Sequence, residues 1–324
     1  MGWFTTLAVD EFLAEAGEFL RAEPVRNTVI LSVTENLRLK AAAGPPPARP
    51  AGHGGAETDW EHGRLPGHDE PWFGWWRPAS GEDAAGSTGQ NTAGIVICGA
   101  FMHTPGFPVF LTSMSSEAAA GLASLLAAAR RRVPGVNAEA QAAEAFTDTW
   151  RHGTGDAVTA RLGMRLFRLD ALLWPDPAPE GISRVADERD RDLLIGWFDA
   201  FAREIDEPAG HDHAAAVAER LGYGGIMIWE AGGAPVSIAG ITRAVGGMVR
   251  VGPVYTPPAL RGRGYAGGAT ASASQAALDA GATQVVLYTD LANPTSNALY
   301  ERLGYRPVED RVVLSFTPGS APGS

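Results

Sequence analysis

The sequence predicts a mixed α/β protein of two domains. Segments rich in Val, Ile and aromatic residues are bounded by Gly-rich turns, and they alternate with Ala- and Leu-rich segments of helical spacing. The chain has 324 residues, more than one average domain. Three prolines in WPDPAPEG break both helix and strand, so residues 174–181 are predicted to be a linker. We therefore expect domains at 1–173 and 182–317, with residues 318–324 as a disordered tail.

Composition narrows the function classes. The formal net charge is -11 and Lys40 is the only lysine, which argues against an extended basic face for nucleic acid. The sequence contains no apolar run near the roughly 18 residues that cross a bilayer, so no membrane association is expected. The N-terminus lacks the features of an export signal, and Cys98 has no partner for an internal disulfide. A cytoplasmic location fits these observations.

The first half reads as helices around strands. Residues 1–20 predict a first helix and residues 24–38 a second. Residues 41–70 are rich in Pro and Gly, which predicts a flexible insertion, and its His53, His62 and His68 match no ligand spacing, so no metal site is expected. The further expected elements are strands at 72–78 and 91–101, helices at 115–132 and 139–151, and a strand at 164–173.

The second half gives a clearer alternation. A helix is expected from Arg184 to Ile205, because large apolar residues recur there at helical spacing. Gly-rich turns then separate three strands of an antiparallel meander. The expected elements after the first helix are strands Gly225–Glu230, Pro235–Arg243 and Met248–Thr256, a helix Gly264–Ala280, a strand 283–290, a short helix led by Asn293, and a strand 311–316.

The most informative segment is the turn between the third strand of the meander and the Ala-rich helix. Gly262 and Gly264 let the backbone approach an anion, and the helix N-terminus presents free N–H groups with partial positive charge. Arg261 and Arg263 add full charges, and the chain has no acidic residue between 231 and 278. A local positive field in an acidic protein predicts a site for a polyanionic ligand.

One alternative for this turn is a dinucleotide-binding fold. Gly262, Gly264 and Gly267 spell GxGxxG, and Asp290 stands near the place of a ribose-binding acid. Against this, residues 257–261 separate the strand from the first glycine, whereas the dinucleotide fingerprint needs a tight turn. About 60 residues follow, too few for the second half of such a sheet.

The segment Arg261-Gly262-Arg263-Gly264-Tyr265-Ala266 resembles the Q/R-x-x-G-x-G/A loop of the GNAT superfamily of acyl-CoA-dependent N-acetyltransferases. The element order around it is similar to that fold, as is the downstream TDLANPTSNALYERLGYRPV. The resemblance covers roughly residues 181–316. It implies two GNAT-like domains, each a mixed, mostly antiparallel twisted sheet flanked by helices. The first half has no such loop, so it looks like a degenerate copy that binds no acetyl-CoA.

The resemblance also implies roles for particular residues. The loop residues would cradle the pyrophosphate of acetyl-CoA, and the backbone of Val254, Tyr255 and Thr256 would bind the pantetheine arm on a strand that splays from its neighbour. The sequence Gly252-Pro253 fits a bulge in that strand. The predicted cofactor-binding set is Val254, Tyr255, Thr256, Arg261, Gly262, Arg263, Gly264, Tyr265, Ala266, Asn293 and Asn297.

Candidate catalytic residues follow from the same resemblance. Tyr300 corresponds to a tyrosine that protonates the leaving thiolate, although it could instead be a packing residue. Glu230 and Asp290 are candidate bases, although each is also what a solvated strand end looks like. Asn293 could be only a helix cap. In the first half, His103 and the aromatic cluster Trp72, Phe73, Trp75 and Trp76 are candidates to line the substrate cleft or to form core.

The function implied is N-acetyl transfer from acetyl-CoA to a primary amine, most simply of a small molecule, because an acidic surface tolerates a compact cation. Two alternatives stay open: a non-catalytic acyl-CoA-binding regulatory module, and acetylation of a protein or peptide amine. No metal is implied, and a homodimer is compatible with the sequence.

Overall fold

The computed structural model of the protein describes residues 2–42, 70–78, 96–207 and 212–319. The chain forms two compact units. Unit 1 comprises residues 1–23, 29–161 and 313–324, and unit 2 comprises residues 24–28 and 162–312. Nearly all of the predicted insertion 41–70 and most of the predicted tail 318–324 lie outside the described residues.

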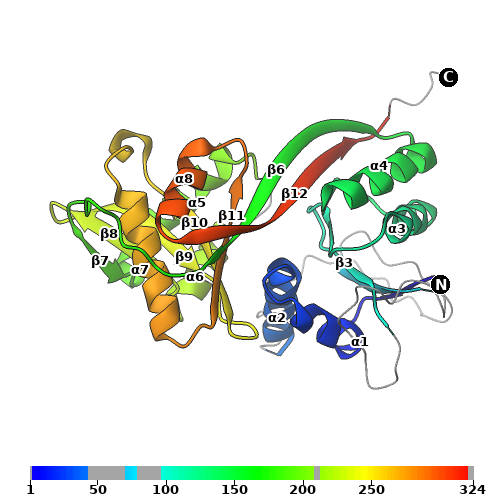
Figure 1. Cartoon of the computed structure of the whole chain (residues 1–324), viewed down its shortest axis with the longest axis horizontal. Helices are drawn as coiled ribbons and strands as arrows, with labels where there is room; N and C mark the ends of the chain where they lie inside the picture. The colour runs from blue at the N-terminus through cyan, green and yellow to red at the C-terminus, as the bar shows by residue number, and fades with distance from the viewer. Residues whose placement is uncertain (1, 43–69, 79–95, 208–211, 320–324) are drawn as a thin grey trace, which may run out of the picture. The chain divides into compact units, whose positions relative to one another are not determined.

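The bounds of the units differ from the predicted domains 1–173 and 182–317, and the predicted linker 174–181 lies inside unit 2. Two long neighbouring strands are the reason (Figure 1): β6 (Ala157–Leu169) and β12 (Tyr305–Thr317) each contribute residues to both units. Prolines and glycines in a sequence mark breaks in local structure, but they do not reveal strands that belong to two units at once.

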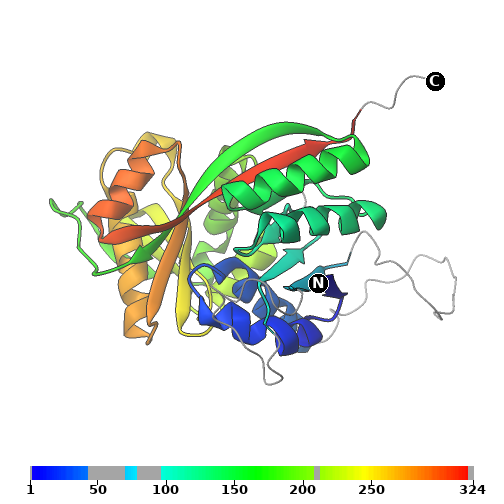
Figure 2. The same ribbon diagram turned by 45° about the vertical axis from the view of Figure 1, so that its right-hand side comes forward.

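Unit 1 is a mixed sheet with helices. Its strands follow the order β1-β2-β3-β4-β5-β12, in which β4 and β5 are parallel and the pairs β1–β2, β2–β3 and β3–β4 are antiparallel. Helices α3 and α4 lie side by side (Figure 2). The elements are β1 (Gly2–Thr6), α1 (Val9–Ala22), α2 (Thr28–Ala42), β2 (Trp72–Arg77), β3 (Gly99–His103), β4 (Val109–Leu111), α3 (Ser116–Ala128), β5 (Gly135–Ala138) and α4 (Ala140–Thr154).

The start of the chain corrects the predicted first helix over residues 1–20. Residues Gly2–Thr6 form strand β1, and the helix begins only at Val9. Trp3 pairs with Trp76 of β2, and its indole Nε1 donates to the carbonyl of Ala118 over 2.9 Å. Aromatic residues favour a pleated surface with cross-strand neighbours, so this tertiary pairing outweighs the amphipathic pattern.

Unit 2 carries a larger, mostly antiparallel sheet. Its strands follow the order β12-β6-β11-β10-β9-β8-β7; β10 and β11 are parallel, whereas β6–β11, β9–β10, β8–β9 and β7–β8 are antiparallel. The predicted mixed sheet flanked by helices is confirmed. The elements are β7 (Ile182–Val185), α5 (Arg191–Glu204), α6 (His213–Leu221), β8 (Ile226–Ala231), β9 (Ala234–Ile241), β10 (Met248–Tyr255), α7 (Tyr265–Asp279), β11 (Gln284–Asp290) and α8 (Pro294–Arg302).

Helices cover both faces of this sheet. Met227 and Trp229 of β8 pack in the cluster that contains the buried face of α7, whereas Ile226 and Ile228 pack with α5 and α6. This alternation is what a strand buried on both faces requires. Ala269, Ala273 and Ala277 are fully or almost fully buried, which lets α7 lie close on the strands (Figure 1).

The predicted helix from Arg184 is wrong at its beginning. Residues Ile182–Val185 form edge strand β7, which pairs with β8, and the helix begins at Arg191. Asp187 and Asp190 form a capping box around a short 3₁₀ turn, so they mark where the helical segment starts. Helix α6 was not predicted, although Asp212 caps it by accepting from the N–H of Ala215 over 2.9 Å.

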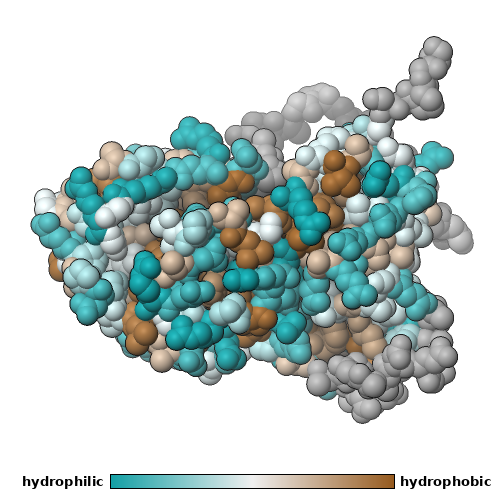
Figure 3. Space-filling view, turned by 45° about the horizontal axis from the view of Figure 1, so that its top comes forward, coloured by the Kyte–Doolittle hydropathy of each residue, from teal (hydrophilic) through white to brown (hydrophobic). Residues whose placement is uncertain are grey.

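On the face drawn in Figure 3, apolar residues occur in small groups separated by hydrophilic ones. Among the described helices, none has the length and apolarity that crossing a membrane requires.

Candidate functional site

Strands β10 and β11 separate in the middle of the unit 2 sheet. Their parallel ladder runs from Met248↔Gln284 to Val251↔Leu287, yet β10 continues to Tyr255 and β11 to Asp290. A register shift between β10 and β9 falls between Val251 and Val254, which confirms the predicted bulge. The edge of β10 that faces away from β9 is therefore left outside the ladder beyond Val251, and such an edge can bind an extended ligand through its backbone.

The turn after β10 delivers the chain to the start of α7. Gly262 has φ +77° and Gly264 has φ +80°, in the left-handed region that glycine adopts without steric cost. Residues 261–264 are all exposed, whereas Tyr265 is buried. The motif glycines are thus required by the backbone path of the turn itself.

The N-terminus of α7 carries no side-chain cap. Gly264 occupies the N-cap position, and no side chain accepts a hydrogen bond from the first turn there. The first N–H groups of a helix have no intrahelical acceptor, and the helix dipole adds partial positive charge at this end. An exposed and uncapped helix start of this kind is suited to an anion.

The first turn of α7 also has close neighbours. A Cβ added to Gly264 would lie 3.3 Å from the Cβ of Pro179, and one added to Gly267 would lie 3.2 Å from Leu299 of α8. A Cβ at Gly268 would enter the indole of Trp229 at 2.8 Å. Small residues are therefore needed for packing as well as for approach to a ligand.

The two arginines of the turn have different surroundings. Arg261 donates from Nε to the carbonyl of Thr256 over 2.8 Å, and its Nη2 contacts both carboxylate oxygens of Glu204 at 2.6 and 2.7 Å. Its guanidinium also lies over the ring of Tyr255. Arg261 thus ties the turn to the end of α5, while Arg263 is exposed. The Glu204 contact was not visible in the sequence, because 57 residues separate the pair.

The side chains of the predicted pantetheine-binding residues are largely structural. Tyr255 is 6% exposed and packs against Trp197, and Thr256 shares a 2.8 Å hydrogen bond with Ser237. The hydroxyl of Ser237 also donates to the carbonyl of Tyr255 over 3.0 Å. Val254 is partly buried, and Ala266 follows the buried Tyr265. The side chains are engaged within the protein, so the backbone is the part of these residues that can contact a ligand.

Tyr300 lies on α8 inside the core of unit 2. Its side chain contacts Phe167 and Tyr305, and the residue is 8% exposed. Burial raises the pKa of Tyr300 to about 12, so the phenol keeps its proton at neutral pH. Its contacts are those of a packing residue, while its protonation state suits a proton donor.

Asn293 and Asn297 shape the turn between β11 and α8. Asn293 caps α8 by accepting from the N–H of Ser296 over 3.0 Å, which is the alternative role predicted for it. Asn297 donates from Nδ2 to the carbonyls of Asp290 and Asn293 over 2.9 and 2.7 Å. The Oδ1 of Asn297 is buried without a hydrogen-bond partner among the described residues.

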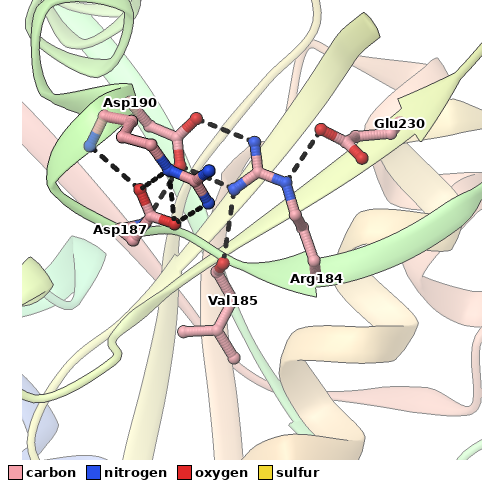
Figure 4. A network of polar contacts seen from close by, with 6 residues as sticks. Arg184, Val185, Asp187, Asp190 and Glu230 are labelled. Carbon is pink, nitrogen blue, oxygen red and sulfur yellow. Dashed lines mark hydrogen bonds and ion pairs between the residues drawn. The ribbon is translucent and has the colours of Figure 1, made fainter. Parts of the chain in front are cut away.

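The two candidate bases are already engaged. Glu230 accepts from Nε of Arg184 over 2.8 Å, and Arg184 also binds both carboxylate oxygens of Asp190 at 2.6 and 2.8 Å (Figure 4). These contacts, with Asp190 first, raise the pKa of Arg184, while the bond from Arg184 lowers the pKa of Asp190. Asp290 accepts from the N–H of Ala292 over 2.8 Å. Sequence reasoning missed Arg184 because it expected a helix there.

The candidates in unit 1 lie in its core. Trp72, Phe73, Trp75 and Trp76 are at most 7% exposed, and His103 is 1% exposed. His103 accepts from Nε of Arg131 at Nδ1 over 3.1 Å, and burial, with Arg131 as a second cause, lowers the pKa of His103 to about 4. The core alternative therefore describes these residues.

Comparisons with known proteins agree with this geometry. Residues 182–305 match the family model of the acetyltransferase (GNAT) family. No curated protein matches the sequence with significance. A solved Drosophila protein has 16% identity and a TM-score of 0.58, and the match covers 96% of either chain. A GCN5-related N-acetyltransferase from Sphaerobacter thermophilus has 13% identity and a TM-score of 0.56, covering 96% of this chain and 94% of that one. The turn, the separated strands and the family match all fall in the same segment, so residues 182–305 form a domain of the acetyltransferase (GNAT) family.

Proposed function

We propose that the protein is an N-acetyltransferase that transfers the acetyl group of acetyl-CoA to a primary amine of a small molecule. The observation that carries the proposal is the uncapped start of α7 at Gly264, which one turn of the chain joins to the strand edge of β10 that has left its ladder. A pyrophosphate and an extended pantetheine arm need these two features next to each other. The family match at residues 182–305 supports the same chemistry.

The reaction joins a neutral amine to the thioester carbonyl. The nitrogen lone pair forms the new C–N bond, the C–S bond breaks, and the electron pair leaves with sulfur as a thiolate. One proton leaves nitrogen and one is received by sulfur, so the products are an amide and free thiol. Holding the two reactants together in one orientation supplies much of the rate enhancement, and N–H donors near the carbonyl oxygen supply more.

Three groups of residues take part in this proposal. The turn 261–266 binds the pyrophosphate, with Arg261 holding the turn in position through Thr256 and Glu204. The backbone of residues 254–256 binds the pantetheine arm. Tyr300, which is protonated at neutral pH, gives its proton to the thiolate.

Thiol release from acetyl-CoA over a panel of primary amines tests the proposal. Arg261→Ala is expected to raise the KM for acetyl-CoA by about 10- to 100-fold, because a charge-assisted contact is worth roughly 1.5–3 kcal/mol. Arg189→Ala is the matched control, since Arg189 is an exposed arginine whose ion pair with Asp187 lies outside the turn. Equal kinetics for both variants would contradict the assignment of the turn.

One observation favours a second candidate, a non-catalytic acyl-CoA-binding module. Glu230 is paired with Arg184, and Asp290 holds a turn, so neither carboxylate is presented as a ready base. Calorimetry with CoA separates the candidates: binding without thiol release for any amine would favour the module. Protein or peptide amines in the same panel test the remaining alternative.

Unit 1 fits a supporting role in this proposal. Its helix α3 also follows a strand, but Ser115 caps it by accepting from the N–H of Ala118 over 3.2 Å. That cap takes one of the donors which an anion would use. We therefore expect unit 1 to bind no acetyl-CoA.

A further inference from the structure

Two polar side chains lie where β10 and β11 separate, on the face of the sheet opposite α7. In the parallel ladder Arg250 pairs with Val286, and paired residues share a face. Tyr288 follows Val286 by two positions and so lies on the same face. The intervening Val251 and Leu287 pack in the cluster that contains α7. Arg250 is thus the last residue before the final rung of the ladder, and Tyr288 is the first after it.

Both side chains bury polar atoms without a partner. Among the described residues, Nη1 of Arg250 and the hydroxyl of Tyr288 have no hydrogen-bond partner, and neither atom is open to solvent. Leaving a buried donor unsatisfied is costly, and more so for a charged group. Native structures keep few such groups, and those that remain are completed by an ordered water, an ion or a ligand.

The backbone holds Arg250 firmly in place. Its N–H donates to the hydroxyl of Thr242 over 3.0 Å, and its carbonyl accepts from the N–H of Thr242 over 2.9 Å. Burial lowers the pKa of Arg250, and the nearby Tyr288 raises it, so the two groups interact electrostatically. The unsatisfied donors therefore sit on rigid strands and not on a loop.

The charges around this position are mostly positive. Arg220 lowers the pKa of Arg250 further, and the Nε of Arg220 is also buried without a partner among the described residues. Arg311 and Glu309 both act electrostatically on Tyr288. Glu309 already accepts from Arg311 at 2.6 Å and from Arg26 at 3.2 Å, so its charge is shared. Two guanidinium groups, each with a buried nitrogen atom, thus act on each other here, and an anion would balance their charge.

We propose that the amine acceptor carries a carboxylate, and that Arg250 and Tyr288 bind this carboxylate on the face of the unit 2 sheet opposite α7. This rests on the proposed acetyl transfer. A guanidinium N–H and a phenol O–H supply two donors for the two oxygens of a carboxylate. The carboxylate lies where the strands part, and the amine of the same molecule reaches toward the strand edge that presents the thioester. The acceptor is therefore an amino acid or a short peptide with a free carboxylate.

Matched pairs of amines test this proposal. Each L-amino acid of a panel is compared with its own C-terminal amide, which keeps the amine and the side chain but removes the negative charge. The expected preference of kcat/KM for the acid is about 10- to 100-fold, typical of a charge-assisted hydrogen bond. Arg250→Met should abolish this preference while leaving the KM for acetyl-CoA unchanged. Tyr288→Phe should reduce the preference by a smaller factor.

A structural role for Arg250 would give a different pattern. Removing a guanidinium that serves the fold lowers the melting temperature, whereas removing an uncompensated buried charge leaves it equal or higher. We expect the second result for Arg250→Met. Arg243→Met is the control. Arg243 lies a few residues before Arg250 in the sequence, and it is an exposed arginine stacked on Tyr223.

The failure of this proposal differs from the failure of acetyl transfer. If amines are acetylated without preference for acids, or if Arg250→Met keeps the preference, the carboxylate site is refuted and the enzyme remains. If no amine is acetylated, acid and amide are titrated calorimetrically into the protein with CoA. Tighter binding of the acid that is lost in Arg250→Met supports the site, and equal or absent binding of acid and amide refutes it.

Discussion

Helices α3 and α7 each follow a strand of their own unit, but they begin in opposite ways. The start of α3 is closed by the side chain of Ser115, which accepts from the N–H of Ala118. The start of α7 is Gly264, with no side-chain cap and a left-handed backbone. A side chain satisfies one N–H group at the start of α3, whereas no side chain does so at the start of α7. The proposed anion site lies at the helix start that has no side-chain cap.

Among the variants of unit 2, Tyr300→Phe should have the largest effect on activity. Removing the phenol proton donor should lower kcat by about 100-fold, with the affinity for CoA retained. Because burial raises the pKa of Tyr300 to about 12, the wild-type rate should show no loss from its ionisation up to about pH 10. Steady-state kinetics between pH 7 and pH 10 measure both effects. An unchanged kcat would leave Tyr300 as a packing residue.

Gly264→Val closes the open helix start with a Cβ. The residue would stand at φ +80° with its Cβ 3.3 Å from Pro179, so both the turn and the approach of an anion suffer. We expect CoA affinity to fall by at least about tenfold in calorimetry. Gly232→Val is the control, because Gly232 has φ +59° with no atom within 4 Å of the added Cβ. Equal losses in the two variants would mean that backbone strain alone is being measured.

His103 should make the stability of unit 1 depend on pH, whereas the proposed site in unit 2 should show no such dependence. Its pKa is lowered to about 4 in the folded chain, against an ordinary value of 6.5. Between these values the unfolded chain binds a proton that the folded chain does not, so this stabilisation is full above pH 6.5 and is lost as the pH falls toward 4. The loss from pH 7 to pH 5 should be roughly 2 kcal/mol. Urea unfolding of wild type and His103→Gln at both pH values measures it; the same pH dependence in both would assign it elsewhere.

Ser115→Ala should have the smallest effect. Loss of the cap of α3 costs about 1 kcal/mol of stability and leaves the kinetics unchanged. Thermal unfolding and thiol release on the same sample measure the two. If the change altered the KM for acetyl-CoA, the distinction between the closed and the open helix would fail.

Local patterns in the sequence predicted the parts of the site that depend on local backbone. Gly262 and Gly264 at positive φ, the bulge near Gly252-Pro253 and the cap at Asn293 all follow from residue types at short spacing. The antiparallel meander of β8, β9 and β10 followed from apolar segments separated by Gly-rich turns.

Contacts between distant segments could not be predicted in this way. The ion pair of Arg261 with Glu204 and that of Arg184 with Glu230 join segments 57 and 46 residues apart. Strands β1 and β7 are short edge strands whose identity depends on their partners β2 and β8. The positions of Arg250 and Tyr288 on one face became visible only with the register of β10 and β11.

The last strand has a consequence for the order of synthesis. Residues 313–317 of β12 belong to unit 1, where the N–H of Phe316 donates to the carbonyl of Pro134 over 2.8 Å beside strand β5. During translation β5 leaves the ribosome some 180 residues before its neighbour β12, so the two strands cannot pair until the chain is almost complete. Until then its unpaired edge is open to other nascent chains, and expression of an N-terminal half alone would make that exposure permanent.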